Sequence, residues 1–233
     1  MEPQVEATPA ERTQRLYARL AGFLFLGLIV SVFVGSLIVP HIAGNTTFSE
    51  AAKIIAASER SYRVSLTLQL IVTLGGVLLA FALYATVKPV NSFLAQLAMI
   101  FYLEDSFLGW VVWMCSFARL YLYTSSPLVG ARTIPLQTGV DLTRRMGGAA
   151  ENVGGICFGL GLLLFFYLFF RSRYIPRILS SMGLSASALW TALYVANLVF
   201  PEHHAAFQYI SWPPMAVADV TTGFWLMLFA VKT

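Results

Sequence analysis

The chain has 233 residues, of which 58% are hydrophobic and only 11% are charged, and its formal net charge is +4. A soluble domain carries roughly 25% charged residues, so this composition excludes an ordinary soluble protein and indicates one that crosses a membrane several times. The 15 Lys and Arg residues form no basic stripe, so we expect no nucleic-acid partner.

Six apolar stretches are long enough to be membrane-spanning helices, which need about 20 residues each. Backbone polar groups in lipid must be satisfied within their own segment, and the chain lacks the alternating pattern of a membrane barrel. We therefore expect an all-α polytopic membrane protein. A polar, cytoplasmic segment, residues 1–19, precedes a single domain of six transmembrane helices, residues 20–233. The expected spans are residues 20–39, 64–86, 92–123, 152–170, 178–199 and 215–231.

Two of the connections between spans are long. In residues 40–63, Thr47 and Glu50 form the pattern of a capping box, and apolar residues recur at helical spacing after it. We expect a short amphipathic helix there, lying on the membrane surface. Residues 124–150 contain prolines and several glycines, which favours an irregular loop.

Acidic residues inside two of the expected spans indicate where function lies. Glu104 and Asp105 stand side by side in the third span, and Asp219 lies in the sixth. An ionised carboxylate in hydrocarbon costs at least about 2.5–3.5 kcal/mol, so these side chains must face a protein interior or a wet cavity. At about 1.5 Å per residue, Glu104 and Asp105 lie near the bilayer midplane, whereas Asp219 lies only about 6 Å inside its span.

Together with polar residues of neighbouring spans, these acids predict a polar pocket in the outer half of the bundle. Arg63 can pair with Glu59 on one helix face and is expected to anchor an anionic group. The carboxylates are expected to hold a cation or a proton. The alternative is structural, because an acid paired with arginine also locks helices together. The candidate site residues are Arg63, Gln69, Glu104, Asp105, Arg119, Glu151 and Asp219.

Catalytic signatures are absent from the sequence, which has no G-x-S-x-G, phosphate loop, G-x-G-x-x-G, C-x-x-C or H-E-x-x-H. A non-enzyme is therefore favoured, and no cofactor or metal is assigned. Three other functions remain open: a non-catalytic accessory subunit, a membrane-embedded hydrolase and a proton-coupled transporter.

Two further patterns concern packing and position in the membrane. Gly155 and Gly159 predict close packing of two helices. Trp212 and Trp225 are typical of the aromatic belts at membrane interfaces.

Five short segments carry a resemblance to a known family. They are Ser58-Glu59-x-x-x-Arg63, Leu83-Tyr84-x-x-x-Lys88-Pro89-Val90-Asn91, Phe158-Gly159-Leu160-Gly161, Phe170-Arg171-Ser172-x-Tyr174-Ile175-Pro176-Arg177 and Trp225-x-x-x-x-x-x-Lys232. From about Arg15 to Lys232 the chain resembles the bacterial and archaeal family of six-helix integral membrane proteins catalogued only as a domain of unknown function. That family tends to carry an arginine followed three residues later by a glutamate where this chain has Tyr102 and Asp105.

The resemblance implies a six-helix fold in the cytoplasmic (inner) membrane of a bacterium, and it implies no activity. Basic residues tend to stay on the cytoplasmic side, and those in the shortest segments lie on the side of both termini, so we expect both termini in the cytoplasm. The expected partners are membrane lipid, a small polar or amphipathic ligand, and a membrane-protein partner or further copies of this chain.

Overall fold

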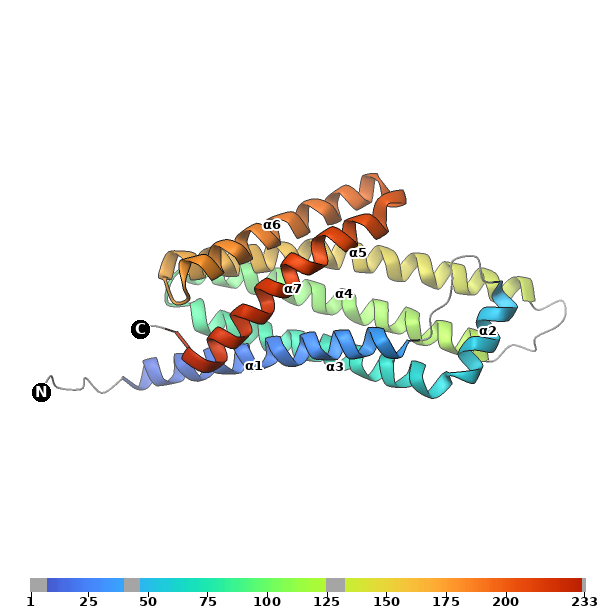
Figure 1. Cartoon of the computed structure of the whole chain (residues 1–233), viewed down its shortest axis with the longest axis horizontal. Helices are drawn as coiled ribbons and strands as arrows, with labels where there is room; N and C mark the ends of the chain where they lie inside the picture. Colours follow the sequence, from blue (N-terminus) through green and yellow to red (C-terminus); the bar gives the residue numbers. More distant parts are fainter. Residues whose placement is uncertain (1–7, 40–46, 125–132, 232–233) are drawn as a thin grey trace, which may run out of the picture.

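The computed structural model describes residues 8–39, 47–124 and 133–231, and in these residues the protein is all-α, as predicted. Seven α-helices and one short 3-10 helix make up the described chain (Figure 1). They are α1 (Pro9–Ile38), α2 (Phe48–Ala57), α3 (Glu59–Val87), α4 (Ser92–Thr124), α5 (Thr133–Ser172), α6 (Arg177–Val199), η1 (Pro201–His203) and α7 (His204–Phe229).

Five of the described helices are long and apolar enough to cross a membrane: α1, α3, α4, α5 and α6. Their outward faces carry large apolar side chains such as Leu37, Phe93 and Ile178, each more than two-thirds exposed. A soluble monomer does not expose so much apolar surface, and this surface indicates a membrane protein. Helix α7 is not among the five, so the predicted count of six spans is not confirmed.

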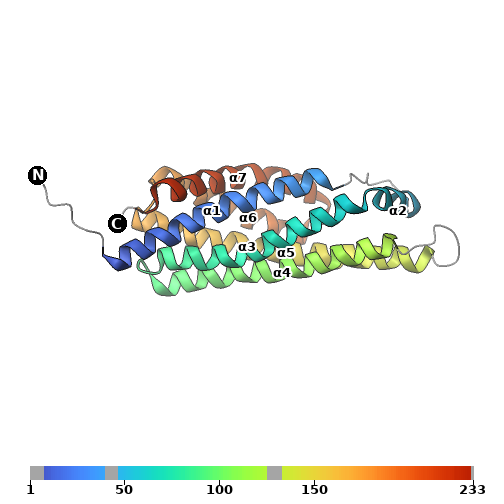
Figure 2. The same cartoon turned by 90° about the horizontal axis from the view of Figure 1, so that it is seen from below.

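The six long helices form a closed ring. Helix α1 packs against α3, α3 against α4, α4 against α5, α5 against α6, α6 against α7, and α7 returns to α1. Figures 1 and 2 show that α1 starts and α7 ends at the same end of the bundle, which we call the terminal end. In this order α4 and α7 lie on opposite sides of the ring, so the acidic residues that they carry approach its interior from opposite directions.

Helix α5 begins well before the predicted span and corrects one expectation. Residues 133–150 belong to a 40-residue helix, although they were predicted to be loop. Pro135 lies in the first turn, where helical amides have no partner and a missing N–H is tolerated. Gly139 and Gly147 bring this part of α5 against Leu122 and Cys115 of α4, so tertiary packing outweighs the loop-like composition. The other residues of the expected loop that follow Thr124 lie outside the described residues.

Helix α7 also begins early, because it passes through Pro213 and Pro214 instead of starting after them. Each proline removes one helical hydrogen bond, which normally ends or bends a helix. Helix α7 as a whole packs against α6 on one side and against α1 on the other. The helix therefore starts eleven residues before the predicted span.

Two capping boxes fix the starts of α1 and α2. Thr8 and Glu11 cap α1 at Pro9, inside the segment that was expected to be a polar tail. The predicted box at α2 is confirmed: the amide of Thr47 donates to Glu50 Oε2 at 3.0 Å, and the amide of Glu50 donates to Thr47 Oγ1 at 3.4 Å. The reciprocal bonds satisfy amides that the first helical turn leaves free.

The short helix α2 packs on the protein with its apolar face. Its buried residues Ala51, Ala52 and Ile55 join a small cluster with Leu120 of α4 and Val140 of α5. The predicted amphipathic helix is therefore present, and its apolar face contacts the long helices at the end of the bundle opposite the terminal end (Figure 2).

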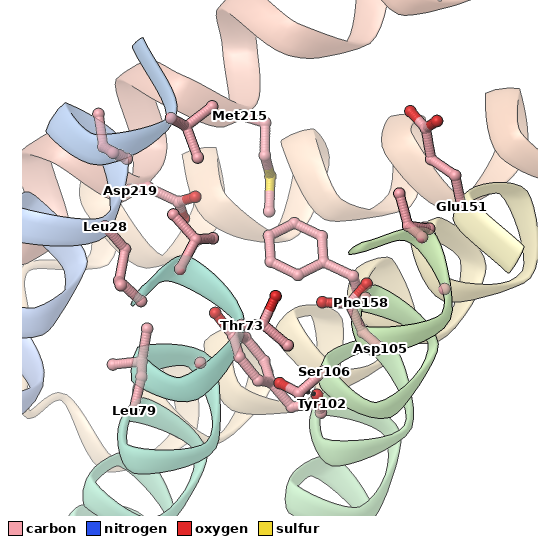
Figure 3. A pocket seen from close by; sticks show the side chains of 18 of the residues that line it. Leu28, Thr73, Leu79, Tyr102, Asp105, Ser106, Glu151, Phe158, Met215 and Asp219 are labelled. Atoms are coloured by element: carbon pink, nitrogen blue, oxygen red, sulfur yellow. Dashed lines mark hydrogen bonds between the residues drawn. The ribbon is translucent and has the colours of Figure 1, made fainter. Parts of the chain in front are cut away.

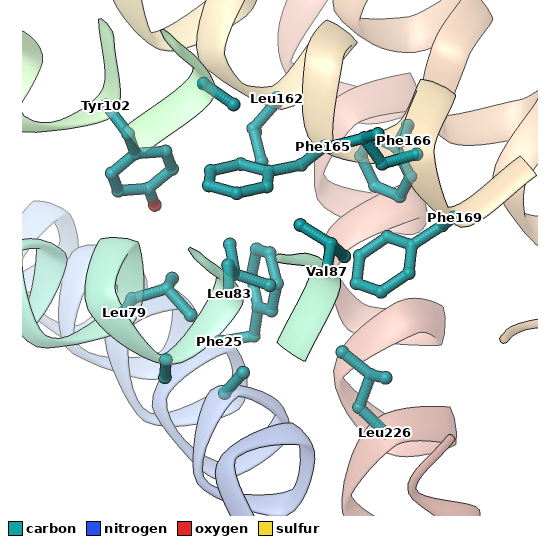
Figure 4. Close-up of a cluster of buried hydrophobic side chains, with 14 of the residues drawn as sticks. Phe25, Leu79, Leu83, Val87, Tyr102, Leu162, Phe165, Phe166, Phe169 and Leu226 are labelled. Carbon is teal, nitrogen blue, oxygen red and sulfur yellow. The ribbon is translucent and has the colours of Figure 1, made fainter. Parts of the chain in front are cut away.

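The interior of the ring is filled near the terminal end. Figure 4 shows part of the filling, an apolar cluster to which all six long helices contribute side chains. Close packing of this kind supplies the dispersion contacts that hold helices together in lipid. The members that are no more than 3% exposed include Phe25, Leu79, Leu83, Val87, Leu162, Phe165, Phe166, Phe169 and Leu226.

Candidate functional site

Beyond this apolar cluster the ring encloses a cavity of about 370 Å³ (Figure 3). Its volume lies within the range of roughly 300–1,000 Å³ that is typical of small-molecule sites. All six long helices line it. The lining residues are Phe25, Leu28, Ile29, Val32 and Phe33 of α1; Gln69, Val72, Thr73, Gly76 and Leu79 of α3; Tyr102, Asp105, Ser106, Gly109 and Val112 of α4; Ala150, Glu151, Gly154, Gly155 and Phe158 of α5; Trp190 and Tyr194 of α6; and Trp212, Met215, Ala216 and Asp219 of α7.

The cavity is closed toward the terminal end and reaches the surface on the other side. Phe25, Leu79 and Tyr102 belong to the apolar cluster and are the lining residues of α1, α3 and α4 that lie nearest the terminal end, so they form the floor. Phe33 is 51% exposed and Trp212 is 39% exposed, and Glu151 is exposed as well, so these three residues form the rim. The cavity is therefore a pocket with an apolar floor rather than a channel through the ring.

Two carboxylates face the pocket from opposite sides of the ring, Asp105 from α4 and Asp219 from α7 (Figure 3). Asp219 is only 7% exposed, and its Oδ1 atom has no hydrogen-bond partner. Asp105 is half-buried and forms no hydrogen bond or ion pair with any described residue. No Lys, Arg or His is found among the described lining residues. Buried polar groups are normally satisfied, so a proton, water or a ligand must complete these two sites.

Two hydroxyl groups also line the pocket, that of Thr73 on α3 and that of Ser106 on α4. Thr73 Oγ1 donates to the carbonyl oxygen of Gln69 at 2.9 Å, and Ser106 Oγ donates to that of Tyr102 at 3.3 Å. Each hydroxyl hydrogen is thus used within its own helix, which leaves the oxygen free to accept a hydrogen bond. Together with the carboxylates, these groups give the pocket several acceptors.

Aromatic side chains of α4, α5, α6 and α7 form a continuous set of rings along the pocket, which we call the aromatic wall. The ring centroid of Trp190 lies 4.9 Å from that of Tyr194, 5.4 Å from Phe158 and 5.5 Å from Trp212. Phe158 in turn lies 5.5 Å from Tyr102. Because the wall runs from α4 to α7, it connects the side of the pocket that carries Asp105 with the side that carries Asp219.

Four of the seven predicted site residues line the pocket: Gln69, Asp105, Glu151 and Asp219. Glu151 lies at the rim, where its Oε1 atom accepts a hydrogen bond from Gln208 Nε2 at 3.3 Å. Asp219 is deeper than predicted, because α7 begins at His204. At 1.5 Å per residue, it lies about 22 Å from the first residue of that helix instead of near its start.

The other three predicted residues lie outside the pocket. Arg63 pairs with Glu59 at 2.7 Å, which confirms the predicted pair, but it is exposed and cannot anchor an anion in this pocket. Glu104 is exposed on the outer face of α4, because adjacent helical positions point about 100° apart. The terminal nitrogen Nη2 of Arg119 donates to Ser116 Oγ at 2.8 Å, and the buried Nε atom of Arg119 has no partner among the described residues.

The aromatic wall is the part of the site that the sequence did not predict. Trp212 was expected in a membrane-interface belt, and the structure also places it in the lining of the pocket. The one signal in the sequence was the pair of glycines, Gly155 and Gly159, which predicted a close approach of two helices. A methyl group on Gly155 would collide with the ring of Tyr194, and one on Gly159 would lie 3.0 Å from Trp190. The glycines thus make room for the aromatic residues of α6.

No group of three or more His, Cys, Asp and Glu side chains is placed to hold a metal ion in the described part of the chain. The polar atoms of the pocket are instead distributed among aromatic and aliphatic side chains. Such a lining suits a molecule with an apolar body and a few polar contacts.

No curated protein and no solved structure matches the chain. A protein family does match, over residues 20–230, and its description is "Domain of unknown function (DUF4386)". The match covers nearly the whole chain, from within α1 to the end of α7, and it agrees with the resemblance found in the sequence. The chain therefore belongs to the DUF4386 family.

Proposed function

We propose that this protein binds a small polar or amphipathic ligand, or a cation, in the pocket inside its helical ring. The observation that carries the proposal is Asp219, which is 7% exposed, lines the pocket and keeps one oxygen without a partner. A helical bundle that needed the acid only for packing would pair it with a basic or donor side chain. An unpaired acid beside an empty volume is typical of a binding site.

The same proposal includes six membrane spans with both termini in the cytoplasm of a bacterium. Helix α7 has 26 residues and lies beside α1 and α6, and at 1.5 Å per residue it is about 39 Å long, enough to cross a bilayer core of about 30 Å. Basic residues at helix ends, such as Lys88, Arg171 and Arg177, lie toward the terminal end. With that end in the cytoplasm, the pocket opens toward the outer side of the membrane.

A second candidate function is supported by Glu104, which lies midway along α4 on its outer face. The neighbouring positions Ile100 and Phe107 on the same face are more than half exposed, so a carboxylate stands in an apolar surface. A charge facing hydrocarbon is costly unless another chain covers it. The accessory-subunit function therefore predicts that Glu104→Gln weakens an assembly while ligand binding in the pocket persists. An unchanged assembly in the Gln variant, measured on native gels in mild detergent, would contradict it.

The test of the binding function is to fill the pocket without changing its charges. Ala216 lines the pocket, whereas its neighbour Val217 is 52% exposed and does not, so Ala216→Phe and Val217→Phe form a matched pair on one helix. The protein is purified from native membranes, and retained small molecules are identified by native mass spectrometry. We expect a molecule that is retained by the wild type and Val217→Phe and is lost from Ala216→Phe. If folded Ala216→Phe protein retains the same molecules as the wild type, the proposal is wrong.

A further inference from the structure

The pocket combines carboxyl groups, other acceptor atoms and aromatic rings, and this combination points to the charge of its ligand. Asp105 and Asp219 contribute carboxylates from opposite sides, and Glu151 adds a third at the rim. The described lining offers no cationic side chain to balance them. An anionic ligand would find no cationic partner in the described lining, and a neutral apolar ligand would leave the buried oxygen of Asp219 unsatisfied. A neutral donor would satisfy that oxygen but would not balance the carboxylates. A cation satisfies both requirements.

The surroundings of the carboxylates distinguish an organic cation from a metal ion. Hard metal cations such as Na⁺, Mg²⁺ and Ca²⁺ require several oxygen ligands close together. In the described residues no group of three or more His, Cys, Asp and Glu side chains is placed to hold a metal ion, and most residues of the lining are aliphatic or aromatic. Sites for ammonium groups with carbon substituents need fewer oxygens and more apolar contact.

The aromatic wall supplies that contact. Phe158, Trp190, Tyr194 and Trp212 lie in one connected set of rings, and Tyr102 continues it to the floor. Aromatic rings attract a cation through the negative potential of their faces, and tryptophan does so most strongly. Sets of aromatic side chains are the usual recognition element for quaternary ammonium groups.

We propose that the ligand of this pocket is an organic cation, an alkyl- or aryl-substituted ammonium group whose charge lies near Asp105 and Asp219 and whose carbon substituents contact the aromatic wall. This inference rests on the proposed binding function and adds the chemical class of the ligand. The volume of about 370 Å³ limits the bound part to a small cation or to the head of a longer amphiphile. The apolar floor holds the uncharged part of the molecule.

Three probes of nearly the same shape test the sign of the charge. Benzyltrimethylammonium is the cation, neopentylbenzene replaces its nitrogen by carbon and is neutral, and benzylsulfonate is an anion of similar size. Binding is measured to the whole protein in lipid nanodiscs, as the difference between the wild type and Ala216→Phe, which removes the contribution of partitioning into lipid. We expect the cation to bind more tightly than the neutral probe, and the anion not to bind.

Adjacent carboxylates provide a matched control for the site. Asp105→Asn and Asp219→Asn should each weaken binding of benzyltrimethylammonium by roughly 10- to 100-fold, because each variant removes a negative charge close to a cation that donates no hydrogen bond. Glu104→Gln, one residue from Asp105 but outside the pocket, should leave the affinity unchanged.

Two tryptophans of α7 test the aromatic wall. Trp212→Leu should weaken binding about 2- to 5-fold, because it removes cation–π attraction. Trp225→Leu changes a residue of the same helix outside the lining and should leave the affinity unchanged.

The outcomes separate this inference from the binding function itself. If cation and neutral probe bind equally and both are lost in Ala216→Phe, the pocket binds ligands and the inference about charge is wrong. If the anion binds best, or if Glu104→Gln weakens cation binding and the two Asn variants do not, the inference is also wrong. If no probe distinguishes the wild type from Ala216→Phe, both proposals fail for this class of molecule. Should an Asn variant not fold, the comparison of the three probes on the wild type still decides.

Discussion

The indole Nε1–H of Trp190 on α6 donates a hydrogen bond to the carbonyl oxygen of Gly155 on α5, at 2.9 Å. The ring of Tyr194, one turn further along α6, lies directly against the same glycine. One position of α5 thus holds two aromatic side chains of the pocket. The absence of a side chain at Gly155 is what allows the stacked pair of Trp190 and Tyr194 to approach the backbone of α5.

Gly155→Ala should therefore destabilise the protein by about 1–3 kcal/mol, the usual effect of forcing an extra methyl group into a packed interior. The matched control is Gly148→Ala on the same helix, where a methyl group would meet nothing within 4 Å. That control should be neutral or slightly stabilising, because alanine favours helix over glycine. Melting temperatures of both variants in detergent check the difference. Equal melting temperatures for Gly155→Ala and Gly148→Ala would contradict the packing of Tyr194 on α5.

Gly22 closes the ring between α1 and α7 in a similar way. A methyl group on Gly22 would lie 2.5 Å from the amide nitrogen of Met227 and 2.6 Å from the carbonyl oxygen of Gly223, both backbone atoms that cannot turn aside. Gly22→Ala should separate the two helices and lower the melting temperature, and Gly27→Ala, with nothing within 4 Å, should not. Because α1 and α7 both line the pocket, Gly22→Ala should also weaken binding of benzyltrimethylammonium. Normal stability and binding in this variant would show that the helices meet elsewhere.

The start of α2 should loosen in acid. The amide of Thr47 donates to the carboxylate of Glu50, and this hydrogen bond, helped by the Thr47 hydroxyl, lowers the pKa of Glu50 below its usual 4.5. A lowered folded-state pKa means that the carboxylate stabilises the cap above the unfolded pKa and that this stabilisation is lost as the pH falls through the folded pKa. Hydrogen-exchange protection factors of residues 48–57, compared at pH 7 and pH 3, should fall in the wild type. In Glu50→Ala they should be lower at pH 7 and should change less with pH.

The six-span topology predicts which loops a membrane-impermeant thiol reagent can reach. In a background with Cys115 and Cys157 replaced by Ser, Glu202→Cys between α6 and α7 should be labelled from outside intact cells. Lys88→Cys and Arg177→Cys, at the terminal end, should be labelled only after the cells are opened. A C-terminal reporter should be active in the cytoplasm. If Glu202→Cys reacts from outside while the reporter is also external, α7 does not cross the membrane and the chain has five spans.

The sequence by itself determined the fold class and most helix positions. Spans predicted at 64–86, 92–123 and 178–199 agree with α3, α4 and α6 within a few residues at each end, because runs of apolar residues that long have no other stable form in lipid. The capping box at Thr47 and the pair of Glu59 and Arg63 were also predicted correctly, since both depend on contacts within one turn of helix.

Only the tertiary structure decided which of the acids share a site. Glu104 and Asp105 are adjacent in the chain, yet one faces outward and the other faces the pocket, because the rotation of α4 is set by its packing against α3 and α5. Asp219 is deep because α7 continues through Pro213 and Pro214, a choice that neighbouring helices impose against local preference. The aromatic wall likewise depends on which helices close the ring, and a linear pattern of hydrophobicity does not encode that order.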